Sequence, residues 1–238
     1  QELIENKILI PASPKNRDWG WDTLSRLFHI GTAATMPPNI REVNYEEEGL
    51  GYLKYCNSIA ETIPPDAFTH EKGEGDIPLQ PQKGDLKMSL VDALAKRKTS
   101  RSFEDQPLHF SELSNILSLA FEYRHHHDEP EIRALGIETP APQRSSPSGG
   151  SLQSTECYLL VRNVEGLEPG VYHYRSHKNS LGRISSLPQD LNLGHFFAGQ
   201  MCAEDLGVAF VLTSRFDKLW WKYNHSRAYR VALLDVGH

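Results

Sequence analysis

The sequence predicts an α+β fold in which helices flank one central mixed sheet. Short apolar runs that suit buried strands occur at residues 157–161 and 208–212. Apolar side chains recur at helical spacing in the segments around these runs. Helices interleaved with strands that are not contiguous in sequence are typical of a layered domain built on a single sheet.

Composition excludes several classes of protein. The 238 residues are enough for one substantial core, and 39% hydrophobic with 24% charged residues is ordinary for a globular chain. A net charge of −6 argues against binding to a nucleic-acid backbone. No apolar run approaches the ~20 residues that span a bilayer, and the first residues lack the apolar segment of a signal peptide. We therefore expect a cytoplasmic protein.

Residues 1–83 are predicted to form an N-terminal lead-in, and residues 84–238 a separate domain. Within the lead-in, Asp22 is placed to cap a short amphipathic helix that carries Leu24 and Leu27. Proline, glycine and charged residues dominate from residue 63 to 82. Because prolines fix φ and remove amide donors, we expect an extended linker without regular structure there.

Two helices are predicted at the start of the domain. Leu90, Val91 and Leu94 share one helical face that leads into residues 97–103. Ser111 is a plausible N-cap for the next helix, with Glu112 in its first turn, where a negative charge suits the helix dipole. Apolar residues then recur at helical spacing, at Leu113, Ile116, Leu117 and Ala120.

The polar segment 123–143 contains His125, His126 and His127, which could bind a metal. Adjacent positions do not converge on one ion, so we favour a solvated loop and no metal site. The cysteines at 56, 157 and 202 are far apart in sequence and predict neither a disulfide framework nor a zinc site. Cys157 and Cys202 are expected to be buried thiols.

Three strands and two further helices complete the predicted domain. After the strand at 157–161, a turn at 166–170 leads to a second strand at 171–174. A helix at about 196–206 precedes the third strand, and Ser214 is placed to cap a closing helical segment through residue 236. That helical pattern reaches the last residue without a cap, so we expect the fold to continue beyond His238.

A cluster of basic residues follows the first helix of the domain. Arg97, Lys98 and Arg101 place three cations within five residues, and Thr99 and Ser100 add hydroxyls. Guanidinium groups fork onto phosphate oxygens and hydroxyls satisfy the remaining lone pairs, so the set suits a phosphate. The alternative is a solvated basic face, which such runs usually form.

A glycine pair precedes the first strand, in the stretch Pro147, Ser148, Gly149 and Gly150. Two glycines permit positive φ and let the backbone approach a flat ligand closely. A simple turn at the entry to the strand is an equally good interpretation. The stretch supports a ligand site mainly through its place in the chain, where a basic cluster, a helix, the glycine pair and a buried strand follow one another.

Lys222 and Tyr223 form the third candidate. A phenol beside an ammonium is a sensible acid–base unit, because the cation favours the phenolate. Adjacent side chains diverge on a helix, so the two need a turn or a shared ligand to act together. The alternative is an amphipathic helix with its tryptophans in the core and its charges outside.

Taken together, these stretches resemble the nitroreductase superfamily. Residues 97–103 resemble the Arg-x-Ser-x-Arg-x-Phe signature that opens its domains, with Thr99 in place of the usual serine. Residues 144–150, 156–158, 170–174 and 222–230 resemble the SagB-type branch, which contains the thiazole/oxazole-forming peptide dehydrogenases. The resemblance implies a nitroreductase-like, FMN-dependent fold, usually an intertwined homodimer with FMN at the interface.

The resemblance also implies roles for particular residues. Cofactor binding falls to two sets: Arg97, Lys98, Thr99 and Arg101 around the ribityl phosphate, and Pro147, Ser148, Gly149 and Gly150 along the flavin ring. Lys222 and Tyr223 match the pair assigned to catalysis in the azoline dehydrogenases.

The implied activity is that of an FMN-dependent oxidoreductase that oxidises thiazoline or oxazoline rings in a peptide to azoles, with a cyclodehydratase as a possible partner. One alternative is a reductase of nitro compounds or quinones, or another small-molecule flavin enzyme, because fold does not settle substrate. Another is a flavin-free interaction subunit of a peptide-modifying complex. Reduction by NAD(P)H distinguishes the first alternative, and a colourless protein that ignores FMN indicates the second.

Overall fold

The computed structural model describes residues 22–32, 50–51, 54–56, 58–59, 62, 71–126, 134, 142–223 and 225–238. The chain divides into two compact units, Gln1–Ile40 and Arg41–His238, so the boundary expected near residue 83 falls inside the second unit. In the first unit, helix α2 (Thr23–Gly31) begins after Asp22. Asp22 Oδ1 accepts a hydrogen bond of 2.7 Å from Ser25 N, which confirms the predicted cap.

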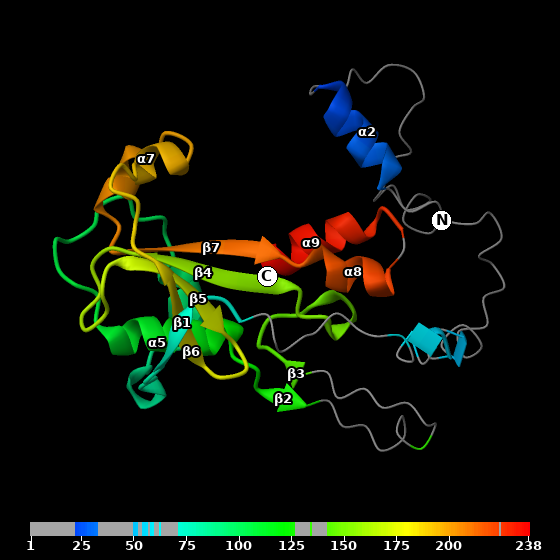
Figure 1. Cartoon of the computed structure of the whole chain (residues 1–238), viewed down its shortest axis with the longest axis horizontal. Coiled ribbons are helices and arrows are strands. Elements are labelled where there is room, and N and C mark those ends of the chain that lie inside the picture. Colours follow the sequence, from blue (N-terminus) through cyan, green and yellow to red (C-terminus); the bar gives the residue numbers. More distant parts are fainter. Residues whose placement is uncertain are drawn as a thin grey trace. The chain divides into compact units, whose positions relative to one another are not determined.

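The second unit is built on a five-stranded sheet (Figure 1). Its strands, in spatial order, are β1 (Glu74–Pro78), β6 (Ser180–Ser185), β5 (Gly170–Arg175), β4 (Thr155–Val161) and β7 (Val208–Ser214). The α+β class is confirmed, but every described strand pair in this sheet is antiparallel, so the expected mixed sheet is wrong. For β4–β5 and β5–β6 the physical reason is connection length, since these strands follow one another through connections too short to join parallel strands.

Helix α5 (Phe110–Phe121) packs on one face of the sheet and forms the core with it. Leu113 and Leu117 are fully buried there, together with side chains from the strands, Leu159, Val161, Tyr172, Tyr174 and Leu181. The helix begins two residues earlier than predicted: its N-cap residue is His109, and Ser111 lies inside its first turn. Glu112 occupies the first turn, as expected.

The remaining elements are short. They are η2 (Lys83–Asp85), α4 (Leu90–Lys96), β2 (His125–His126), β3 (Pro142–Gln143), η3 (Gly149–Ser151), α7 (Leu193–Phe196), η4 (Met201–Asp205), α8 (Phe216–Lys222) and α9 (Ala228–Gly237). The helix expected at 196–206 is thus two separate pieces, α7 and η4. The closing helical segment is also divided, into α8 and α9, and it starts after Arg215 rather than Ser214. His127 lies outside the described residues.

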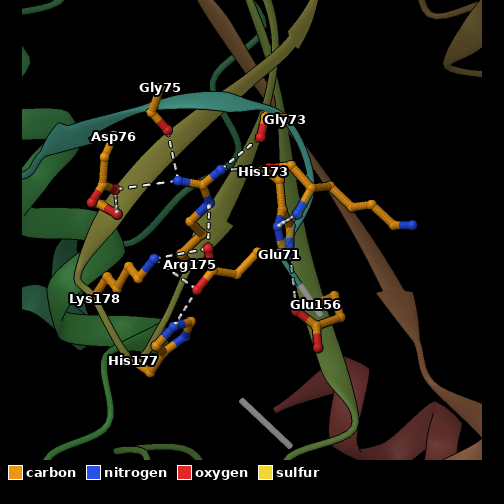
Figure 2. Close-up of polar contacts among 11 residues, drawn as sticks. Glu71, Gly73, Gly75, Asp76, Glu156, His173, Arg175, His177 and Lys178 are labelled. Atoms are coloured by element: carbon orange, nitrogen blue, oxygen red, sulfur yellow. Dashed lines mark hydrogen bonds and ion pairs between the residues drawn. The ribbon is translucent and has the colours of Figure 1, made fainter. Parts of the chain in front are cut away.

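Strand β1 lies inside the stretch predicted to lack regular structure, and that prediction is wrong here. Its sequence, Glu-Gly-Asp-Ile-Pro, is poor in strand-forming residues, so contacts with the rest of the sheet must form it. Arg175 on β5 supplies them (Figure 2). Its guanidinium donates to the carbonyl oxygens of Gly73 (2.7 Å) and Gly75 (2.7 Å), and it forms an ion pair of 3.3 Å with Asp76.

Further charges surround this contact. Glu71 accepts hydrogen bonds from His177 and Lys178, both at 2.8 Å (Figure 2). These hydrogen bonds, that from Lys178 first, hold the pKa of Glu71 below its ordinary value. A β-carbon at Gly182 would lie 2.5 Å from Arg175 Nη2, so a glycine is required where the guanidinium crosses β6.

The cysteines differ in burial among the described residues. Cys157 is buried, and its burial raises the pKa of the thiol to about 12, as an inert core cysteine requires. Cys202 is only partly buried, and all three cysteines are free. Within the described part of the chain, no cluster of three or more potential ligands could hold a metal ion, and no helix is long and apolar enough to cross a membrane.

Candidate active site

A strained turn precedes strand β4. Gly150, Ser151 and Gln153 have φ values of 63°, 57° and 49°, in the left-handed region. This conformation costs an L-residue roughly 1–2 kcal/mol, so the two non-glycine positions persist only if neighbouring groups hold them. The predicted glycine pair therefore opens a turn that depends on its surroundings.

Asp235 on α9 holds the beginning of this turn. Its Oδ1 accepts from Gly149 N at 3.0 Å and its Oδ2 from Ser148 Oγ at 2.9 Å. Ser148 Oγ accepts in turn from Gln153 N at 2.9 Å. A β-carbon at Gly149 would lie 2.2 Å from Val231 Cγ1, so α9 packs directly on the glycine.

Lys222 and Tyr223 approach the same turn from α8. The helix ends between them, and Tyr223 has extended backbone angles (φ −123°, ψ 93°). The two adjacent side chains therefore converge on Gly150. Lys222 Nζ donates to Gly150 O at 3.3 Å, and a β-carbon at Gly150 would lie 2.4 Å from Tyr223 Oη and 3.0 Å from Lys222 Nζ. The helix end provides the turn that cooperation between these neighbours requires.

The basic cluster is placed differently. Arg97, Lys98, Thr99 and Arg101 lie exposed in the irregular segment that follows α4. Among the residues that the structure describes, no hydrogen bond or ion pair links their side chains to the 148–150 turn. Within one chain, two of the three predicted parts of the site lie together, the glycine turn and the Lys222–Tyr223 pair.

A pocket of about 420 Å³ adjoins the turn, with Pro147 and Asp235 in its lining. Arg144 lines it as well and is only 6% exposed. Its guanidinium donates to Thr155 O (2.5 Å) and Ser176 Oγ (2.9 Å), and its Nε has no hydrogen-bond partner. The wall of the pocket therefore contains a buried guanidinium beside the turn.

A buried polar pair lies on the sheet face opposite α5, at Glu156 and His173. His173 Nδ1 accepts from the Lys72 amide at 3.2 Å, and an amide can only donate, so the ring proton is on Nε2. Nε2 lies 3.2 Å from Glu156 Oε2 and donates to it. The pair is thus held by hydrogen bonds on this face of the sheet.

Sequence reasoning missed Asp235, Arg144 and the buried Lys218. A usable signal exists for Asp235, because a lone carboxylate in the apolar run 231–236 needs a polar partner when its helix packs against the domain. Arg144 and Lys218 carry no comparable signal, since a basic residue in a mixed stretch usually faces solvent.

The fold defined by this sheet and its helices is nitroreductase-like. The crystal structure of a nitroreductase-type protein from Anabaena variabilis superimposes with a TM-score of 0.52 at 19% identity. The match covers 95% of this chain and 39% of that one. The family model for the nitroreductase family matches residues 94–238, more than half of the sequence. The chain belongs to the nitroreductase family, whose members are oxidoreductases that generally bind a flavin.

Three individual proteins are similar to this chain in sequence. A nitroreductase-type protein of Methanocaldococcus jannaschii is 28% identical over 155 residues, which cover 63% of this chain and 69% of that protein. The trifolitoxin-processing protein TfxB of Rhizobium leguminosarum is 32% identical over 100 residues, 40% of this chain and 27% of TfxB. The trifolitoxin operon protein TfxC of the same organism is 23% identical, over 99% of this chain and 67% of TfxC.

Proposed function

We propose that this protein is an FMN-dependent oxidoreductase that oxidises thiazoline or oxazoline rings in a peptide to the aromatic azoles. The observation that carries the proposal is the convergence of Lys222 and Tyr223 on Gly150. The similarity to a trifolitoxin-processing protein supports a peptide as the substrate class.

The glycine turn and the side chains packed on it form the proposed flavin site. The missing β-carbons admit Val231 Cγ1 beside Gly149, and Tyr223 Oη and Lys222 Nζ beside Gly150, so the catalytic candidates lie against the turn. In this proposal, Pro147, Ser148 and the two glycines line the ring, and the basic cluster of Arg97, Lys98, Thr99 and Arg101 holds the phosphate. Bound FMN would supply the two-electron acceptor that ring oxidation requires.

The chain's own residues supply the proton chemistry. Oxidation of an azoline removes one proton and one hydride from adjacent ring carbons and leaves a double bond. Tyr223 Oη is assigned as the base that takes the α-proton. Lys222, whose Nζ lies 5.9 Å from the centre of the tyrosine ring, is assigned to assist that base. The hydrogen bond from Lys222 to Gly150 O orients the ammonium.

The test combines a flavin spectrum with mass spectrometry. Purified protein with FMN and a cyclised peptide should remove two hydrogens per ring, a mass loss of ~2 Da. Tyr223→Phe should lower the rate by about 10²-fold or more, because the base is lost. Tyr229→Phe, which alters a 48% exposed tyrosine on α9, is the matched control and should keep the rate. Full azoline oxidation by Tyr223→Phe would contradict the assignment.

A nitro or quinone reductase is the second candidate, favoured by the similarity to the M. jannaschii protein. A reductase needs rapid reduction of its flavin by NAD(P)H, whereas azoline oxidation needs no nicotinamide. Anaerobic mixing of the FMN-loaded protein with NADH or NADPH, followed at the flavin absorption band, separates the two. A colourless protein that ignores added FMN would instead indicate an interaction subunit.

A further inference from the structure

Lys218 on α8 has one of the most buried charged side chains described, only 2% exposed. Placing an ammonium in such a position is costly unless a partner compensates it. Its Nζ donates to Gln153 O at 3.2 Å, and Gln153 is one of the two non-glycine residues held at positive φ in the turn. The buried charge is therefore directed at the strained backbone beside the candidate site.

Lys218 and Lys222 are four residues apart on α8 and so lie on the same helix face. Lys222 Nζ donates to Gly150 O and Lys218 Nζ to Gln153 O, at the two ends of the left-handed segment. We propose that Lys218 is a positioning residue that holds residues 150–153 in their strained conformation and so fixes Gly150 opposite Lys222 and Tyr223. The positioning role itself is structural, and its effect on catalysis rests on the proposed function.

The charges facing Lys218 come from several elements. Glu156 on β4 and Asp217 on α8 favour its ammonium form, whereas Arg215 and Arg144 disfavour it. Burial outweighs these effects and lowers the pKa of Lys218 to about 8. Below that pH the side chain is a charged donor, and above it a neutral amine, which makes a weaker hydrogen bond. The hydrogen bond from Lys218 to Gln153 O should therefore weaken as the pH rises through about 8.

The first test follows amide hydrogen exchange in the protein without flavin. The amides of Ser151, Leu152 and Gln153 are hydrogen-bonded within the turn and report its opening. In Lys218→Met they should exchange about tenfold faster at pH 7, whereas amides of β5 and β6 should not change. Lys218→Arg should keep the slow exchange. Lys178→Met, which removes an exposed lysine, is the control.

The second test measures the affinity for FMN by fluorescence between pH 6.5 and 9.5. The affinity of the wild-type protein should fall by a few fold as the pH rises through about 8. Lys218→Met should bind FMN more weakly at every pH, and Lys218→Arg should keep its affinity, both without a change near pH 8. Near-UV circular dichroism shows whether each variant is folded. If Lys218→Met does not fold, the comparison of wild type with Lys218→Arg and the pH profile of the wild type decide the role of Lys218.

The two proposals fail separately. If the wild-type protein binds no FMN, the proposed function is lost, but amide exchange still decides the role of Lys218. Unchanged exchange of residues 151–153 in folded Lys218→Met would overturn the positioning role, as would a pH step in flavin affinity that persists in Lys218→Arg.

Discussion

At Gly150, the space that a β-carbon would fill is already occupied by Tyr223 Oη and Lys222 Nζ. Under the proposed function, Gly150→Ala should therefore displace the proposed catalytic pair and lower azoline oxidation at least tenfold, measured by mass loss of the peptide. Gly166→Ala is the matched control, because Gly166 also has positive φ (73°) but nothing within 4 Å of its β-carbon position. Both variants should lose roughly 1–2 kcal/mol of stability, and only Gly150→Ala should lose activity. Equal activity in the two variants would contradict the site.

Individual residues also show what could be predicted from the sequence. Their chemistry made the glycine pair and the Lys222–Tyr223 pair candidates, and the family resemblance gave them roles. The structure places the two pairs in contact. Their convergence was not predictable, because it depends on α8 ending at Lys222. Asp235 and Lys218 act on the backbone of a distant turn. The apolar run around Asp235 indicates that this carboxylate needs a polar partner, but no local pattern identifies the turn as that partner.

At the scale of single elements, strand β1 depends on Arg175. Arg175→Leu should cost about 3 kcal/mol in the free energy of unfolding, because the carbonyl oxygens of Gly73 and Gly75 lose their donor and Asp76 loses its ion pair with the buried guanidinium. Urea unfolding measures the loss, and amide exchange should show β1 opening before β4 and β5. Lys178→Met removes a half-exposed ion pair with Glu71 and should change stability little. A similar loss in both variants would show that surface charge, and not the buried guanidinium, holds the strand.

The elements that were predicted correctly are those with a strong local pattern. Strands β4 and β7 are apolar runs, and α5 carries apolar residues at helical spacing. Strand β1 was missed because Gly75, Asp76 and Pro78 disfavour a strand locally, and its pairing with β6 together with the contacts of Arg175 overrides that preference. Strand β6 was missed as well, because Gly182 interrupts its pattern, and the glycine is there to admit the same guanidinium.

For the whole molecule, the homodimer remains a proposal with a specific surface. Residues on and before α4 expose apolar side chains: Leu86, Met88, Leu90, Val91 and Leu94, the last three at 74%, 76% and 68%. Exposed apolar side chains gathered on one short segment favour an interaction site. We expect the double variant Leu90→Glu, Leu94→Glu to sediment as a monomer and the wild type as a dimer. Ile184→Glu, at a single exposed apolar position, should not change the mass. A wild-type monomer would contradict the proposal.

The strand order has a consequence for the way the molecule assembles. The β4–β5–β6 meander is local in sequence, whereas β1 reaches its place only when Glu74 meets Arg183. Closing a long loop is slow relative to forming adjacent hairpins, so β1 should dock late, after the folding transition state. Weakening its attachment would then accelerate unfolding and leave the folding rate nearly unchanged. The lifetime of the native state, more than the speed of reaching it, is what the Arg175 contact controls.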